Sequence, residues 1–167
     1  MLQITIPATE LWDGEKEEFV NLKEQTLQLE HSLVSLKKWE SKWHKPFISK
    51  EDKTDEEIID YVKCMTITQN VDPRIYDYLT SENIKQIDEY INNPMTATVF
   101  SDEKSKRFNR EVVTAEIIYY WMVALQIPPE YQKWHLNQLL TLIKVCNIKN
   151  APQKKESKRA IMSRNAA

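Results

Sequence analysis

The chain has 167 residues, a formal net charge of −2 at pH 7 and a hydrophobic content of 41%, which is sufficient for one domain with a real core. Its single glycine, Gly14, excludes the P-loop and dinucleotide-binding classes, because loops that press the backbone against phosphate need several glycines. The sequence has no uninterrupted apolar stretch of about 18 residues, so we expect no membrane span.

The first thirty residues predict a small β-hairpin or meander. Apolar side chains alternate with polar ones from Leu2 to Ile6, and again within residues 19–22 and 26–29, which is the period of a β-strand. Asp13-Gly14 is a typical turn sequence between them. Because two or three short strands are not stable alone in water, we expect this sheet to pack on the helices that follow.

Helical periodicity begins after Ser32 and continues to Asn150. The expected helix starts lie at Ser32, Thr54 with Glu57, Asp72-Pro73, Thr80, Thr114 and Pro128-Pro129. Residues 95–100 are expected to form a short strand or an extended link. The helix after Thr114 has almost no polar residues, which predicts that it is the central buried helix. The fold class is therefore mainly α (α+β), with the N-terminal hairpin packed on a bundle of about five to six helices.

Charge divides the chain into a body and a tail. We expect residues 1–150 to form a single helical domain and residues 151–167 to be a flexible basic tail. The tail includes Lys154, Lys155, Lys158 and Arg159, and residues 150–167 sum to +4 while residues 1–149 sum to −6. Such a tail can be simply solvated, contact a protein or bind nucleic acid.

The residues that carry chemistry are scattered. His31, His44 and His135 lie apart, each among Trp, Lys or Leu residues, and neither a His-x-x-x-His nor a Cys-x-x-Cys spacing is present. We therefore predict no catalytic site, no metal and no cofactor, and a binding protein in place of an enzyme. Cys64 and Cys146 lie among apolar neighbours, which favours reduced, buried thiols and a cytosolic compartment.

Aromatic and basic residues alternate in one stretch, residues 39–47. It contains Trp39, Trp43 and Phe47, with Lys42 and Lys45 between them. The same pattern arises from core packing with lysine stems along the rim, from a groove for a partner helix, or from a single-stranded nucleic-acid site. Among surfaces for a partner, we rank this stretch ahead of the basic tail, with the exposed edge of the last helix as a second contact.

Four segments together resemble a family of small proteins encoded by tailed bacteriophages and prophages of Gram-positive bacteria. They are residues 29–35 (LEHSLVS), 39–47 (WESKWHKPF), 93–98 (NPMTAT) and 132–137 (QKWHLN). Within phage biology, the order of elements and the charge distribution resemble those of tail assembly chaperones. The resemblance implies binding to the tape measure protein and the tail tube protein in the host bacterial cytoplasm, without a catalytic residue.

Other functions remain open from the sequence. One alternative is a structural part of the virion, such as a neck or connector protein. A nucleic-acid-binding accessory protein would use the basic tail. The apolar excess in residues 114–149 is consistent with a homo-oligomer, although packing within the chain could also absorb it.

Overall fold

The computed structural model describes residues 1–13, 17–49, 51–100 and 112–151. The strands are β1 (Leu2–Ile6), β2 (Thr9–Asp13), β3 (Glu18–Leu22) and β4 (Gln25–Leu29). The α-helices are α1 (Leu33–Trp43), α2 (Asp55–Met65), α3 (Ser81–Asn92), α4 (Ala115–Ala124) and α5 (Leu136–Asn150). Two 3₁₀ helices, η1 (Pro73–Tyr78) and η2 (Pro129–Lys133), complete the described elements. The predicted mainly α fold with an N-terminal hairpin is confirmed.

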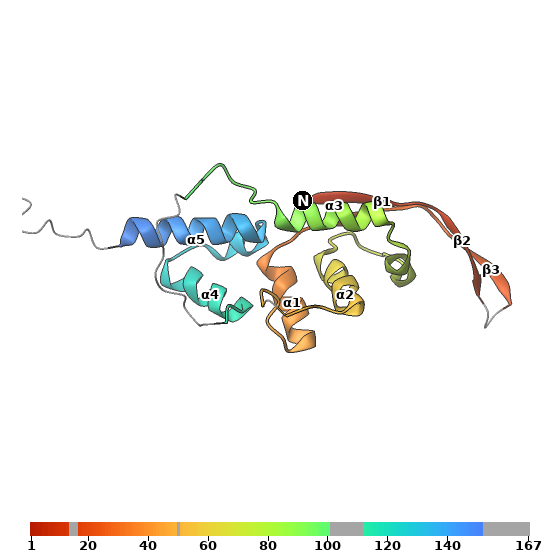
Figure 1. Ribbon diagram of the computed structural model, residues 1–167, viewed down its shortest axis with the longest axis horizontal. Coiled ribbons are helices and arrows are strands. Elements are labelled where there is room, and N and C mark those ends of the chain that lie inside the picture. The colour runs from red at the N-terminus through yellow and green to blue at the C-terminus, as the bar shows by residue number, and fades with distance from the viewer. Residues whose placement is uncertain (14–16, 50, 101–111, 152–167) are drawn as a thin grey trace, which may run out of the picture.

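The four strands form a long hairpin and not a meander. β1 pairs with β4 so that Ile4 lies opposite Leu27, and both side chains are buried. Farther out, β2 pairs with β3. This outer half of the hairpin, hereafter the arm (residues 9–13 and 18–22), extends well beyond the helices (Figure 1). On the arm, Trp12 lies opposite Phe19.

One hydrophobic cluster lies beneath the base of the hairpin. Strands β1 and β4 contribute alternate residues, as expected for a sheet with one covered face, and α1, α2, η1 and α3 complete it. Its buried members are Ile4, Ile6, Leu27, Leu29, Trp39, Tyr61, Val62, Met65, Ile75, Tyr76 and Ile87. The short segment after α2 also joins the sheet edge, because the backbone N–H of Ile67 donates to the carbonyl of Gln28 at 2.8 Å.

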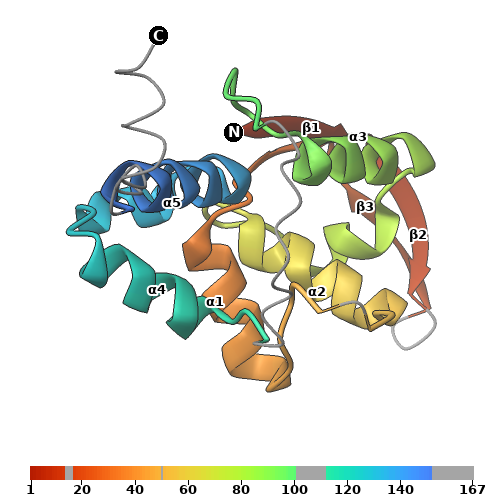
Figure 2. The ribbon, with the colours of Figure 1, turned by 60° about the vertical axis from the view of Figure 1, so that its left-hand side comes forward.

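A second cluster fills the space among α1, α4 and α5. Its buried members are Leu33, Leu36, Ala115, Ile118, Met122, Ile127, Leu136, Leu139 and Ile143. Helix α1 therefore has two covered sides, with Leu36 in this cluster and Trp39 in the other, and it lies between α2 and α4 in both ribbon views (Figure 2).

The prediction that the helix after Thr114 is the central buried helix is wrong. Helix α4 buries Ala115, Ile118 and Met122, while Tyr120 and Val123 are 66% and 78% exposed. The central position belongs to α1, which has fewer apolar residues but lies between both clusters. Residues 95–100, expected as a strand or an extended link, contain no strand and form the link.

Local capping signals explain where most helices begin. Ser32 with Ser35, Thr54 with Glu57 and Thr80 with Asn83 each form a reciprocal capping box, which satisfies backbone N–H groups that a helix start leaves unpaired. None of the described helices is long and apolar enough to cross a membrane.

Candidate protein-binding surface

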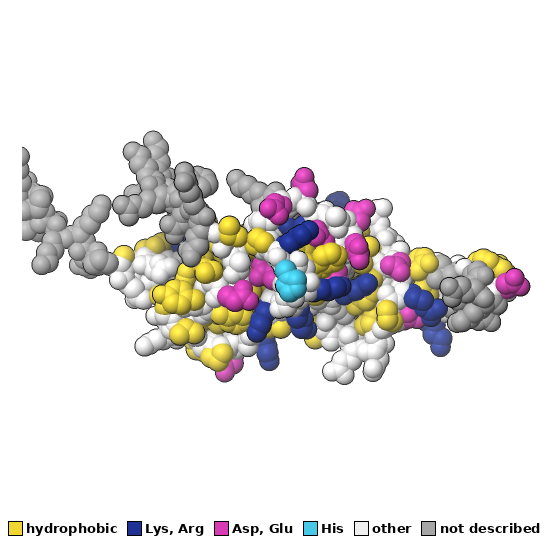
Figure 3. All heavy atoms as spheres, turned by 90° about the horizontal axis from the view of Figure 1, so that it is seen from below, with side chains coloured by type: hydrophobic (Ala, Val, Ile, Leu, Met, Phe, Trp, Pro, Cys, Tyr) yellow, Lys and Arg dark blue, Asp and Glu magenta, His cyan; other side chains and the backbone are white. Residues whose placement is uncertain are grey.

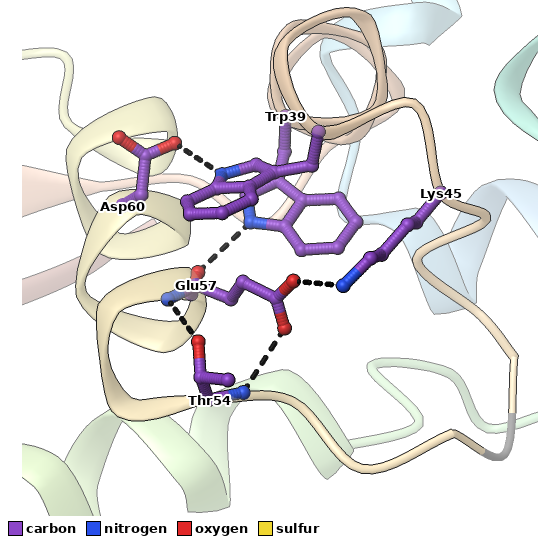
Figure 4. Close-up of polar contacts among 6 residues, drawn as sticks. Trp39, Lys45, Thr54, Glu57 and Asp60 are labelled. Atoms are coloured by element: carbon purple, nitrogen blue, oxygen red, sulfur yellow. Dashed lines mark hydrogen bonds and ion pairs between the residues drawn. The ribbon is translucent and has the colours of Figure 1, made fainter.

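Trp39, the first residue of the predicted binding stretch, lies in the interior. Its side chain is 0% exposed, and its Nε1–H donates to the backbone carbonyl of Glu57 at 2.8 Å (Figure 4). A buried indole whose N–H is satisfied inside the chain gives no surface to a partner. The contacts of Trp39 agree with the packing interpretation, and its role in binding a partner stays a prediction.

Trp43 and Lys42 are both tied to one carboxylate on α2. Trp43 is half-buried and its Nε1–H donates to Oδ2 of Asp60 at 2.9 Å. Lys42 forms an ion pair with Oδ1 of the same side chain, and this contact raises the pKa of Lys42. The indole of Trp43 also stacks on that of Trp39, with ring centroids 6.2 Å apart. Together, these contacts attach the end of α1 to α2.

Lys45 is paired with Glu57 at the start of α2. Its Nζ lies 2.5 Å from Glu57 Oε1, while Glu57 Oε2 accepts the backbone N–H of Thr54 at 3.0 Å (Figure 4). The hydrogen bond from Lys45, and then that from Thr54, lowers the pKa of Glu57 although burial opposes the change. This carboxylate therefore caps its own helix and anchors the loop after α1.

Phe47 packs against aromatic rings of the first cluster and also borders the second. Its ring stacks on that of Tyr61 with centroids 3.8 Å apart, meets Trp39 edge-on at 5.1 Å, and has the ammonium of Lys53 4.8 Å from its centroid. The structure thus brings together Trp39, Trp43, Phe47, Lys42 and Lys45, but their contacts are largely to one another and to α2. In this stretch the chain packs on itself, and a groove for a partner there stays a prediction.

A buried carboxylate that the sequence did not single out organises this region. Glu40 is 9% exposed. Its Oε1 accepts the backbone N–H of Phe47, and its Oε2 accepts that of Ala115, both at 2.8 Å. Thr114, the residue before α4, makes no side-chain cap, so Glu40 stabilises the positive end of that helix in its place.

Two of the histidines meet inside the molecule. The rings of His31 and His135 are 5.1 Å apart at an interplanar angle of 66°, and both are 3% exposed. His135 Nδ1 accepts the backbone N–H of Asn137, so its Nε2–H donates to the carbonyl of Tyr90 at 3.0 Å. Burial, and then the adjacent His135, lowers the pKa of His31 to about 3. Both rings are therefore neutral and structural near pH 7.

The described residues contain no group of three or more His, Cys, Asp or Glu side chains that could bind a metal ion. His44, the third histidine, is exposed at the end of α1 with a left-handed backbone (φ 53°).

The basic tail lies outside the described residues, including Lys154, Lys155, Lys158 and Arg159. Its predicted role therefore stays a prediction.

Among the described residues, an unfilled apolar surface lies on α4 and α5. On the outward side of α4, Tyr120 and Val123 are exposed one turn apart. Beside them an open pocket of about 430 Å³ lies between the two helices. Its lining is Trp121, Leu140, Ile143, Lys144, Asn147, Ile148 and Ala151. Hydrophobic side chains are also visible at this end of the molecule in the space-filling view, whereas lysines gather nearer the middle (Figure 3).

The exposure of this surface is unusual for a helix of such apolar composition. A helix that is apolar on nearly every side is normally enclosed, yet α4 leaves one side to solvent. Contiguous exposed apolar patches mark sites of protein association. Comparison with known proteins adds no assignment, because no family model, curated protein or solved structure matches this chain.

Proposed function

We propose that this protein is a tail assembly chaperone of a tailed bacteriophage, acting by binding and not by catalysis. In the host bacterial cytoplasm it would hold apolar segments of the tape measure protein or the tail tube protein until they assemble. The family resemblance of the four sequence segments supplies the phage context and the clients. The exposed side of α4 supplies a place for them.

The observation that carries the binding role is the exposure of Tyr120 and Val123. Their solvent-exposed fractions of 66% and 78% belong to a helix that buries Ala115, Ile118 and Met122 in the second cluster on its other side. An apolar helix of a client can lie along such a side, as in helix-in-groove recognition, with Glu116 at the margin providing polar contacts. The contact region thus moves from residues 39–47 to the outward side of α4.

The test is capture of clients from phage-producing cells by the tagged full chain. We expect wild-type protein to enrich the tape measure or tail tube protein, and Tyr120→Asp/Val123→Asp to lose that enrichment. The matched control is Ile67→Asp/Val99→Asp, which changes two other exposed aliphatic side chains (51% and 89% exposed) and should retain capture. If wild-type protein enriches neither client, the chaperone proposal is wrong.

Purified virions separate the chaperone from its alternatives. A chaperone is absent from finished particles, whereas a neck or connector protein would be found in them at a fixed copy number. A nucleic-acid accessory protein would bind DNA with an affinity that falls steeply with salt. That affinity would be lost on deletion of residues 151–167.

A further inference from the structure

Two unfilled apolar features lie at opposite ends of the molecule. The arm projects from one end and helices α4 and α5 lie at the other in both ribbon views (Figures 1 and 2). The pocket is lined by residues of these two helices and by Ala151. The first is a protrusion and the second a hollow. Because the body lies between them, the arm cannot reach the pocket of its own chain.

The arm carries an aromatic pair that is exposed in the described part of the chain. Trp12 and Phe19 are 58% and 64% exposed, and their rings meet edge-on with centroids 4.9 Å apart. A two-stranded ribbon alone is marginally stable in water, and each such ring can bury roughly 150–250 Å² on contact. An exposed, preformed aromatic pair on a protruding ribbon is the kind of anchor that dominates binding at interfaces.

The pocket has a complementary shape and charge. Trp121, Leu140 and Ile148 offer an apolar lining, and its volume of about 430 Å³ lies within the range of sites that enclose a bulky group. Lys144 lies at the rim, its ammonium 3.8 Å from the ring centroid of Phe100. Helix α5 contains Lys144 and Lys149 and no acidic residue, so the side of the pocket that this helix forms is basic.

The arm is correspondingly acidic. Its sequence includes Glu10, Asp13 and Glu18 and no basic residue, a net charge of −3. Opposite charges around an apolar contact speed the encounter and set its orientation. The aromatic pair of the arm therefore suits the apolar lining of the pocket, and the acidic residues of the arm suit the lysine at the rim. The arm and the pocket lie at opposite ends of one chain.

We propose that copies of this protein associate head to tail, with Trp12 and Phe19 of one copy seated in the α4–α5 pocket of the next. Such a contact joins two different surfaces, so each copy retains a free arm at one end and a free pocket at the other. The association closes into a ring or continues as a filament. It is independent of the proposed client site, because Tyr120 and Val123 lie outside the pocket lining.

Sedimentation of the full chain over a range of concentrations tests this contact. We expect wild-type protein to associate beyond a dimer, with weaker association at high salt because the rim contact is between opposite charges. Trp12→Ala/Phe19→Ala in the arm, or Ile148→Asp in the pocket, should raise the dissociation constant by about 30-fold or more, the effect of losing an interface anchor. Ile67→Asp, at a similarly exposed isoleucine (51% against 55%), is the matched control and should associate like wild type.

Mixing the two defective proteins gives the decisive measurement. The arm variant retains its pocket and the pocket variant retains its arm, so an equimolar mixture should form a 1:1 dimer that grows no further. A two-fold symmetric pair, in which each arm fills the other copy's pocket, would also retain one intact contact in this mixture, but its wild-type protein would stop at a dimer. Circular dichroism of each variant verifies that the helices are intact.

Three outcomes would overturn the proposal. Wild-type protein that stays monomeric has no such contact, and a mixture that forms no dimer contradicts the pairing of arm with pocket. If the arm variant keeps self-association but loses client capture, the arm binds a client and not a second copy. If Tyr120→Asp/Val123→Asp loses capture of the client and still self-associates, the result concerns the proposed function and not the contact between copies.

Discussion

Glu40 and Ala115 are 75 positions apart in the chain, yet Glu40 Oε2 accepts the backbone N–H of Ala115 at 2.8 Å. The same carboxylate accepts the backbone N–H of Phe47 through its other oxygen. One side chain of α1 thus fixes both the loop that follows it and the start of α4. The cap of α4 comes from tertiary structure, since the residue before that helix does not supply it.

Glu40→Gln tests this arrangement. Glutamine retains the shape but replaces one acceptor oxygen by a donor, which then faces a backbone N–H. We expect the free energy of unfolding to fall by about 1–3 kcal/mol, the usual range for a buried hydrogen-bonding group left unsatisfied. Urea denaturation followed by circular dichroism measures it. Glu89→Gln, at an exposed residue of α3, should stay within about 0.5 kcal/mol of wild type.

Trp39 should contribute to stability more than any other residue in the stretch from 39 to 47. Trp39→Ala removes a fully buried side chain and should cost about 3–5 kcal/mol. Trp39→Phe retains most of the volume and loses the bond to the Glu57 carbonyl, so its cost should be smaller. Trp12→Ala, at an exposed indole, should change monomer stability by about 0.5 kcal/mol or less. If urea titration shows that Trp39→Ala and Trp12→Ala lower the free energy of unfolding by equal amounts, the assignment of Trp39 to the core is wrong.

The paired histidines predict a loss of stability in mild acid. The pKa of His31 is about 3 in the folded chain and 6.5 in its ordinary range, so the unfolded chain takes up the proton first as pH falls. Above pH 6.5 the neutral His31 does not reduce the free energy of unfolding. Below pH 6.5 the free energy of unfolding falls progressively toward pH 3, by up to about 1.4 kcal/mol per pH unit. The pKa of His135 is lowered too, chiefly by burial, and adds in the same direction.

His31→Gln isolates this effect. The variant should show a shallower dependence of unfolding free energy on pH between pH 7 and about 5, because one titrating group is gone. His44→Gln removes an exposed histidine and should leave the slope as in wild type. Identical slopes for all three proteins would show that the His31 environment does not disfavour its charged form.

The Cys64 thiol should react slowly in the folded chain. Burial, followed by the charge of Asp60, raises its pKa, which lowers the fraction of nucleophilic thiolate. In a Cys146→Ser background, alkylation of Cys64 at pH 8 should be slower in buffer than in urea. A rate in buffer as high as that in urea would contradict this expectation.

The parts of the fold that local sequence determines were predictable. Alternation from Leu2 to Ile6 and the pair Thr54 with Glu57 involve neighbours in the chain, and the hairpin and the start of α2 follow from them. The role of Glu40 was not predictable, because its two backbone partners lie 7 and 75 positions away.

Residues 39–47 illustrate why a binding surface is harder to predict than a helix. Lysines between aromatic residues satisfy the requirements of packing and of docking equally well. In the structure, Lys42 and Lys45 pair with Asp60 and Glu57. The positions of these two carboxylates on α2 depend on the fold of the intervening loop, which the local sequence does not determine. Conversely, the apolar composition of α4 indicated burial, and only the arrangement of helices left Tyr120 and Val123 in solvent.

The two hydrophobic clusters share α1, with Leu36 on one side and Trp39 on the other. Neither cluster can melt without uncovering a side of this common helix, so the described body should unfold in a single cooperative step. Thermal scans followed separately by tryptophan fluorescence and by circular dichroism would then share one midpoint. A partner that binds at α4 would, by the same connection, raise the melting temperature of the hairpin base that lies beyond α1.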